Sequence, residues 1–225
     1  MAGDVQAIWL TGLLALVTTL LLMPLATPLA WWLARSPSRA KSAIEAVVAM
    51  PLVLPPTVLG FYLLVLLNPD TFLGGLWVRA TGGALTFSFA GLVIASMIYS
   101  LPFMVQPLHS AFRAVPESVM EAAATLGASP RDRFFNVGIP LARRGFLTGA
   151  VLTFAHTVGE FGVVLMMGGN IPGETRVLSI AIYEHVETLN YDAAHSLALG
   201  LLCFAFMSLW LVYRLAGERV EVIRG

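Results

Sequence analysis

The chain has 225 residues, a formal net charge of zero and a mean hydropathy of +0.82, with 58% hydrophobic and only 12% charged residues. Soluble globular domains carry about 25% charged residues, so this composition excludes an ordinary water-soluble domain. It predicts an all-α integral membrane protein with a single transmembrane domain over residues 1–225. The single cysteine, Cys203, excludes an internal disulfide and a cysteine-ligated metal site.

Five apolar stretches are long enough to cross about 30 Å of hydrocarbon, which takes about 20 helical residues. They cover residues 7–33, 45–67, 85–107, 145–167 and 193–213. A shorter apolar stretch at 177–186 predicts a short or re-entrant helix. We therefore expect a polytopic helical bundle of about five to six spans. Four glycines at 74, 75, 82 and 83 predict a flexible loop between the second and third spans.

The basic residues predict the orientation. All but two of the 13 lysines and arginines follow the first span, lie in the loop at 108–144, or belong to the tail with Arg214, Arg219 and Arg224. By the positive-inside rule, the 108–144 loop and the C-terminus are cytoplasmic, while the N-terminus and the 168–192 loop are outside. Because these charges mark membrane boundaries, they predict no nucleic-acid binding.

The second and third spans carry candidate residues for a path through the membrane. Pro55 and Pro56 interrupt the second span near its middle, and Thr57 follows them. A discontinuous helix exposes amide groups that can face an anion. The alternative is that the prolines only shape helix packing. In the third span, Ser96 and Ser100 offer hydroxyls to an anion, or make ordinary hydrogen bonds between helices.

The fourth span contains a carboxyl group, Glu160, four residues after His156. This spacing places both side chains on one face of a helix, where they could pair. An ionisable residue at membrane depth is a functional candidate. We expect Glu160 to be paired or protonated and to hold helices together, with a direct role in gating as the second possibility.

The 108–144 loop contains the segment EAAATLGASPRDRFFNVGIP at residues 121–140, which predicts two short helices and a tight break. Glu117 suits a first helical turn, and Gly127 can adopt the left-handed conformation that ends a helix. Ser129 is a candidate N-cap, with Asp132 three residues later, so a second helix begins at once. Pro140 marks its end or a kink.

The first of these helices has an apolar side. Val119, Met120, Ala123 and Leu126 fall on one face of a helical period. This face predicts either a surface for a partner protein or an amphipathic hairpin with no partner.

The spacing of the segment resembles the cytoplasmic EAA loop of ABC importer permeases. Glu-Ala-Ala is followed by three residues, a glycine, nine residues, an aliphatic residue, a spacer and aliphatic-Pro. The matching positions are Glu121, Ala122, Ala123, Gly127, Val137, Ile139 and Pro140, with Val and Ile where the family more often shows Ile and Leu. The resemblance implies that this loop, with Glu117 and Ala128 beside the motif, docks a cytoplasmic ATPase.

Three further runs resemble the molybdate branch of these permeases. They are MPLVLPPTVLGF at 50–61, GEFG at 159–162 and NIPGET at 170–175. The resemblance implies a type I ABC importer permease fold in the bacterial inner membrane. It also implies a homodimer with two ABC ATPase subunits and a periplasmic molybdate-binding protein. Sulfate and tungstate permeases share a GEFG-type segment, so a permease for either anion stays the alternative.

The chain contains no Gly-rich phosphate loop, so we expect it to bind no cofactor itself, and its partner ATPase to use ATP and Mg²⁺. Its four histidines show no metal-ligand spacing, and no Gly-x-Ser-x-Gly elbow occurs, so neither metal ligands nor catalytic residues are predicted and the chain is not an enzyme. An ATP-independent anion channel or carrier is the less favoured alternative, because carriers often show two related halves and this chain shows no internal repeat.

Overall fold

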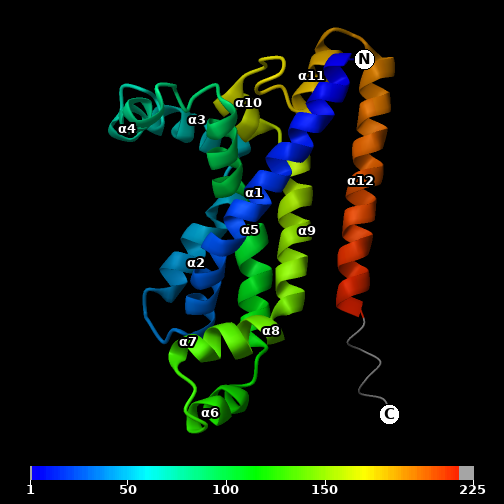
Figure 1. Ribbon diagram of the computed structural model, residues 1–225. Coiled ribbons are helices and arrows are strands. Elements are labelled where there is room, and N and C mark those ends of the chain that lie inside the picture. Colours follow the sequence, from blue (N-terminus) through cyan, green and yellow to red (C-terminus); the bar gives the residue numbers. More distant parts are fainter. Residues whose placement is uncertain (1, 218–225) are drawn as a thin grey trace.

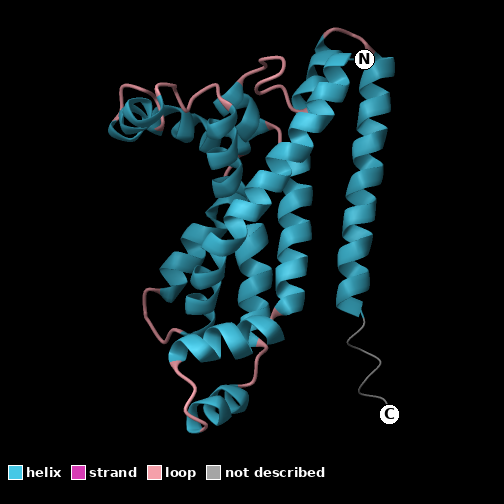
Figure 2. Cartoon of the chain, viewed as in Figure 1, coloured by secondary structure: helices cyan, strands magenta, loops and turns pink. Residues whose placement is uncertain are grey.

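A computed structural model describes residues 2–217 of the chain, which fold into helices with no strand (Figures 1 and 2). The predicted all-α fold is therefore confirmed. The predicted tail residues Arg219 and Arg224 lie outside the described residues. The first helices in chain order are α1 (Ala2–Arg35), α2 (Lys41–Ala49), η1 (Met50–Leu52), α3 (Pro56–Leu66), α4 (Phe72–Thr81) and α5 (Phe89–Arg113). The remainder are α6 (Glu117–Thr125), α7 (Pro130–Asp132), η2 (Arg133–Gly138), α8 (Ile139–Leu141), α9 (Arg143–Gly159), α10 (Gly162–Gly168), α11 (Leu178–Glu187) and α12 (Tyr191–Gly217).

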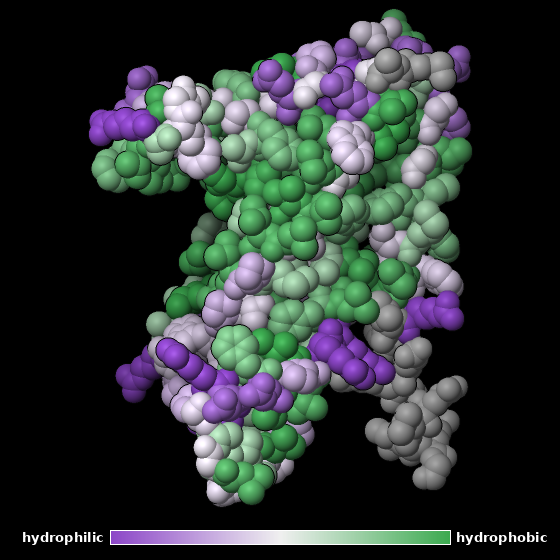
Figure 3. Space-filling model, in the orientation of Figure 1, coloured by the Kyte–Doolittle hydropathy of each residue, from purple (hydrophilic) through white to green (hydrophobic). Residues whose placement is uncertain are grey.

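Three described helices, α1, α5 and α12, are long and apolar enough to cross a membrane alone. Two bent helix pairs pass the same test together, which gives up to five spans. Figure 3 shows apolar residues over the middle of the molecule and hydrophilic residues gathered at its two ends. The N-terminus lies at one end, and α6 and α7 lie at the other (Figure 1). The lower end of the prediction, five spans, is reached if each bent pair is one span.

The second span is broken, as its prolines predict. The pair Lys41–Leu52 and Pro56–Leu66 is bent by 107°. Pro55 stands at the break with φ −54° and ψ 134°. A residue that precedes a proline is pushed out of the helical region, and Pro55 precedes Pro56. The break therefore follows from two adjacent prolines.

The fourth span is also broken, and here the prediction was wrong. Helix α9 ends at Gly159, and α10 continues at an angle of 63°. Glu160 has an extended backbone, with φ −68° and ψ 134°, so it does not share a helix face with His156 and the two do not pair. The close approach of Gly162 to α3 accompanies this break, since a Cβ there would lie 2.8 Å from the Cβ of Pro56.

The end that carries the N-terminus contains two short helices. Helix α4 replaces the predicted flexible loop, because the Thr71 side chain caps it and Gly82, at φ +78°, ends it. Helix α11 forms where a short helix was predicted, and its 10 residues are too few to cross a membrane. Two bonds join α11 to α1: the Leu178 amide donates to Thr11 Oγ1 at 2.7 Å, and His185 Nε2 lies 2.9 Å from Asp4 Oδ1.

Two clusters of buried apolar side chains form the core, and α1 and α5 contribute to both. One cluster includes Leu14, Leu63, Leu92, Val163 and Ile180. The other includes Leu22, Leu33, Met104, Leu108 and Phe112. Between them, the buried residues of α1, α5 and α9 carry hydroxyls: Thr18, Thr19, Ser96, Ser100, Thr153 and Thr157. The middle of the bundle is therefore a hydroxyl-rich layer, and it contains both serines singled out in the sequence.

Candidate functional site

The 108–144 loop forms a compact structure at the end of the molecule opposite the N-terminus (Figure 1). Helix α6 projects from this end, and α7, η2 and α8 form one irregular helix across the ends of α5 and α9. Gly127, at φ +87°, ends α6 with paired bonds, since the Ala128 amide donates to Ala123 O and the Gly127 amide to Ala124 O, both at 3.0 Å. This is the predicted left-handed helix end, in the form of a Schellman motif.

The second helix starts where the sequence predicts. The Ser129 side chain accepts from the Asp132 amide at 3.2 Å, and Asp132 Oδ2 accepts from the Ser129 amide at 3.1 Å. The Ser129 hydroxyl also donates to Asp132 Oδ2 at 2.5 Å, and this bond together with the one from the Ser129 amide holds the pKa of the Asp132 carboxyl below its usual range. The two caps fix the turn between the helices with local bonds alone.

The helix after this cap is not regular. Residues Arg133–Gly138 form a π-helix directly before Pro140. Because proline has no N–H to donate to the preceding turn, a widened turn at this place relieves the missing bond. The same segment packs Phe134 against Trp31 at 5.2 Å and brings Gly138 so close that a Cβ would lie 2.6 Å from the Trp31 ring. The kink predicted at Pro140 therefore takes the form of a π segment.

The predicted apolar face of α6 divides into two parts. Met120 is buried, whereas Leu126 is 88% exposed and Val119 is 39% exposed. Glu121, Ala122 and Gly127 are also exposed, and Ala123 and Ala128 are half-buried. The tip of the molecule thus presents Leu126 and part of Val119 among small side chains.

The second half of the predicted motif faces the bundle. Val137 and Ile139 are half-buried, and Ile139 packs against the apolar cluster around Phe112. Pro140 is exposed. The motif therefore has two parts: Glu121, Ala122 and Gly127 lie on the outer surface, and the aliphatic residues anchor the loop to the membrane helices.

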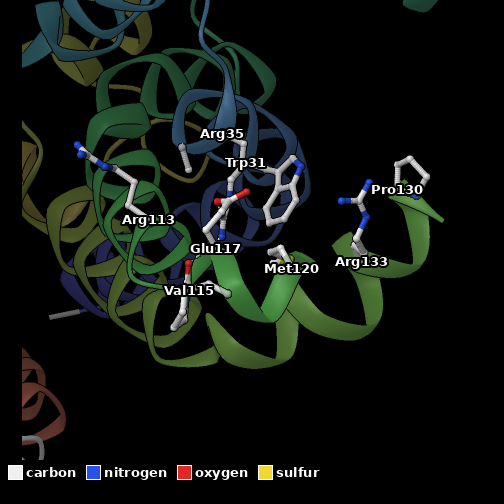
Figure 4. A pocket seen from close by; sticks show the side chains of 10 residues that line it. Trp31, Arg35, Arg113, Val115, Glu117, Met120, Pro130 and Arg133 are labelled. Carbon is white, nitrogen blue, oxygen red and sulfur yellow. Dashed lines mark hydrogen bonds and ion pairs between the residues drawn. The ribbon is translucent and has the colours of Figure 1, made fainter. Parts of the chain in front are cut away.

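A cleft of about 510 Å³ separates α6 and α7 from the ends of α1 and α5 (Figure 4). Arg35, at the end of α1, joins three segments across it. Its Nη1 lies 2.5 Å from Glu117 Oε2, and its Nη2 donates to the carbonyls of Phe112 at 3.2 Å and Val115 at 3.0 Å. The guanidinium also lies over the Trp31 ring, 5.4 Å from its centroid. The start of α6 is thus fixed to both α1 and α5.

A second cavity, also of about 510 Å³, opens between the two helix breaks, and we call it the break cavity. Its lining contains no lysine or arginine. The lining residues are Pro56, Thr57, Tyr99, Ala155, His156, Gly159, Glu160, Phe161, Gly162 and Leu165. Of the predicted path residues, Pro56, Thr57 and Glu160 therefore meet here, although they come from separate spans.

The other predicted path residues are not part of the lining of the break cavity. Pro55 precedes α3, and Ser96 and Ser100 are fully buried in α5. The Ser100 hydroxyl lies 2.9 Å from His156 Nδ1 and 3.0 Å from Thr157 Oγ1. His156 also lines the cavity, although it was not predicted as a path residue. The signal that could have found it is its position one turn before Glu160.

Glu160 is 3% exposed, and within the described part of the chain neither carboxyl oxygen makes a hydrogen bond of good geometry. The nearby Ser96 hydroxyl is likewise without a well-formed bond. The expectation that the Glu160 side chain is paired or protonated therefore stays a prediction, and no well-formed bond to the carboxyl within the described residues supports the paired alternative. Its backbone carbonyl does join helices, because it accepts from the Ser179 hydroxyl of α11 at 2.5 Å.

Metal binding has no structural support in residues 2–217, where no three His, Cys, Asp or Glu side chains are grouped to hold an ion.

Comparisons with known proteins agree with this architecture. The family described as "Binding-protein-dependent transport system inner membrane component" matches residues 26–218. The chain is 58% identical to the molybdenum transport system permease protein ModB of Azotobacter vinelandii, over 93% of each chain. It is 35% identical to the protein of the same name from Escherichia coli strain K12, over 95% of each chain.

A solved structure shows the same fold at low identity. It is a bacterial alginate ABC transporter in complex with a pentasaccharide-bound periplasmic protein, with a TM-score of 0.73 and 15% identity. The match covers 96% of this chain and 79% of that one. The type I importer permease fold is thereby confirmed. The chain belongs to the family of binding-protein-dependent transport system inner membrane components, and its sequence groups with the molybdenum transport system permease proteins within it.

Proposed function

We propose that this chain is the membrane-spanning subunit of an ATP-driven importer that takes up molybdate across the bacterial inner membrane. The observation that carries the proposal is the high identity to a molybdenum transport permease over nearly the whole of both chains. The chain acts as a homodimer, with two ABC ATPase subunits at one face of the membrane and a periplasmic molybdate-binding protein at the other. It does not hydrolyse ATP itself.

The 108–144 loop is the part that receives energy from the ATPase. The chain has no phosphate-binding loop, so energy reaches it only through a docked partner. Helix α6 suits this role because it is exposed at its tip, capped at its end and joined at its start to α1 and α5 through Arg35. Glu121, Ala122, Gly127 and Ala128 lie on the docking side, and Val137, Ile139 and Pro140 connect it to the bundle. Movement of this unit then tilts the packed helices as rigid bodies.

The break cavity is the part that the anion passes. Two discontinuous helices meet there, as they do at many transporter sites. The cavity offers the Thr57 hydroxyl and the histidine ring, and it has no fixed cation. Neutral donors can replace water around a divalent anion without trapping it, which a path requires.

The orientation follows the charges. The 108–144 loop lies at the end opposite the 168–192 loop, and it carries five of the chain's basic residues: Arg113, Arg131, Arg133, Arg143 and Arg144. The ATPase therefore docks on the cytoplasmic side, and the binding protein approaches the side with α11 and the 168–192 loop.

The test is uptake of radiolabelled molybdate into vesicles that contain this chain and the ATPase, with the binding protein added outside. We expect uptake only when all three proteins and ATP are present, and we expect it to resist an excess of sulfate. Uptake abolished by sulfate or by tungstate would assign the transporter to the corresponding sister anion. Uptake without the ATPase would replace the importer with an ATP-independent carrier.

A further inference from the structure

We infer that His156 is a contact residue for the oxyanion, and that it presents a neutral Nε2–H donor to the anion in the break cavity. The inference rests on the proposed function and names an anion-binding group that the sequence motifs do not contain. It starts from the way the imidazole ring is held.

The ring of His156 is fixed on three sides. Nδ1 lies 2.9 Å from the Ser100 hydroxyl. Phe103 stacks on the ring with centroids 3.9 Å apart and planes at 24°, and Tyr99 lies 4.8 Å away at 52°. Ser100 is buried and is not part of the cavity lining, whereas His156 lines the cavity. The edge of the ring that carries Nε2 therefore faces away from Ser100, and within residues 2–217 no hydrogen bond uses Nε2.

The hydroxyl chain behind the ring decides the tautomer. Ser100 Oγ lies between His156 Nδ1 and Thr157 Oγ1, 3.0 Å from the latter, and Ser100 and Thr157 are both at most 2% exposed. If Thr157 donates to Ser100 and Ser100 donates to Nδ1, every hydroxyl hydrogen has an acceptor. The reverse direction leaves the buried Thr157 hydrogen without one, which costs about 1–3 kcal/mol. The proton of a neutral imidazole is therefore on Nε2.

This donor matches the chemistry of the ligand. A tetrahedral dianion such as molybdate offers only acceptor oxygens, so each contact in the cavity needs a donor from the protein. Nε2–H supplies one without a permanent charge, and the Thr57 hydroxyl lines the same cavity. The carboxyl of Glu160 also lines the cavity, and because it is 3% exposed and unpaired within the described residues it favours the neutral form, which does not repel the anion.

The experiment uses the complete transporter in vesicles and compares His156→Leu, His156→Gln and Ser100→Ala with wild type. The readout is molybdate taken up per ATP hydrolysed, measured with saturating binding protein. We expect His156→Leu to lower this ratio roughly tenfold or more, because a hydrogen bond to a charged group is lost. His156→Gln, whose amide restores a donor, recovers part of the ratio. ATPase co-purification and the thermal unfolding midpoint report whether each variant is assembled.

Ser100→Ala separates orientation from packing. If Ser100 acts by holding the ring, its replacement lowers the ratio in wild type and changes nothing in the His156→Leu background. Thr153→Val is the matched control. Thr153 is buried one turn before His156, has no bonded side-chain partner and does not line the cavity, so uptake stays at the wild-type ratio.

A wild-type ratio in an assembled His156→Leu variant overturns the inference. If His156→Leu does not assemble, unchanged ratios in both His156→Gln and Ser100→Ala overturn it equally. A wild-type transporter that carries a different oxyanion contradicts the proposed substrate and not this contact. The variants are then measured with the anion that is carried.

Discussion

The 108–144 loop and the break cavity are built by different kinds of contact. In the loop, the caps join residues three to five positions apart, such as Ser129 and Asp132. In the cavity, the bond that orients the histidine joins residues 56 positions apart, and the lining comes from four helices. Contacts of the first kind can be predicted from a short stretch of sequence. Contacts of the second kind exist only after the bundle has packed.

One residue connects the two kinds of construction. Arg35 is 82 residues from Glu117, and yet it fixes the start of the locally built helix α6. We therefore expect that the tip of the loop can be changed without loss of stability of the fold. A change at a close contact between two membrane helices, which we call a seam, lowers the stability of the whole bundle. Four experiments test this, from the largest expected effect to the smallest.

Leu126→Asp tests the tip of the loop. Leu126 is 88% exposed, so its replacement removes no contact within the chain. If the ATPase covers it, a charge in that contact costs about 2 kcal/mol or more, or roughly 30-fold in affinity. Co-purification with the ATPase measures this, and the thermal unfolding midpoint of the permease alone stays unchanged. Leu189→Asp, at the opposite end, is the control and keeps normal association. Equal association of both variants would show that α6 is not the docking surface.

Gly145→Ala and Gly127→Ala compare the seam with the loop. A Cβ on Gly145 overlaps the Ala111 side chain and lies 3.0 Å from Pro107 O, so overpacking costs about 1–3 kcal/mol and lowers the global midpoint. A Cβ on Gly127 meets nothing, but its φ of +87° costs alanine about 1–2 kcal/mol locally. Hydrogen exchange then rises at the end of α6 alone. A global loss from Gly127→Ala would contradict the independence of the loop.

Arg35→Ala and Glu117→Gln measure the connection between the loop and the bundle. The Glu117 side chain is 71% exposed, so loss of its ion pair costs about 0–1 kcal/mol. Arg35→Ala also removes the bonds to the Phe112 and Val115 carbonyls, so it costs more and loosens the 113–117 segment. Hydrogen-exchange rates across residues 113–117 show which of the two variants destabilises the segment more. Equal effects would assign the whole connection to the ion pair.

Acidification has the smallest expected effect, and it acts on the cap between α6 and α7. The Asp132 pKa is lowered in the folded chain by the hydrogen bonds from Ser129, so the stabilisation is present above the carboxyl's ordinary pKa. It is lost as the pH falls through the lowered value. An NMR titration of the Ser129 amide from about pH 6 to 3 follows the loss. Ser129→Ala moves the Asp132 midpoint upward, and an unmoved midpoint would show that the cap does not set this pKa.

The same distinction explains what the sequence could predict. The turn between α6 and α7 could be predicted from Gly127 and Ser129, because a left-handed residue and an N-cap act on their immediate neighbours. The break in the second span could be predicted from Pro55 and Pro56, because a proline also acts on its immediate neighbours. The five predicted apolar stretches, which match the upper count of spans in the structure, followed from length and hydropathy alone.

The predictions that were wrong concerned features that depend on residues far away in the sequence. The expected His156–Glu160 pair assumed a continuous helix, but the chain leaves the helix at Gly159, and Gly162 approaches Pro56 of another span. Helix α4 was missed because Gly74 and Gly75 normally weaken a helix, whereas the Thr71 cap and close packing of Gly74 on the Asn68 backbone favour it here. His156 was missed as a cavity residue because Ser100, which orients it, lies in another span.

The bonds between α11 and α1 also set an order of assembly. Thr11 and Asp4 have their partners, Leu178 and His185, 167 and 181 residues later in the chain. Because synthesis starts at the N-terminus, the N-terminal half of α1 is made long before those partners exist. Helix α1 is long and apolar enough to cross a membrane before the later helices are made. The polar groups of Thr11 and Asp4 in α1 therefore gain these partners only when α11 has been made. A nascent chain that stops before Arg176 lacks the bonds between α1 and α11.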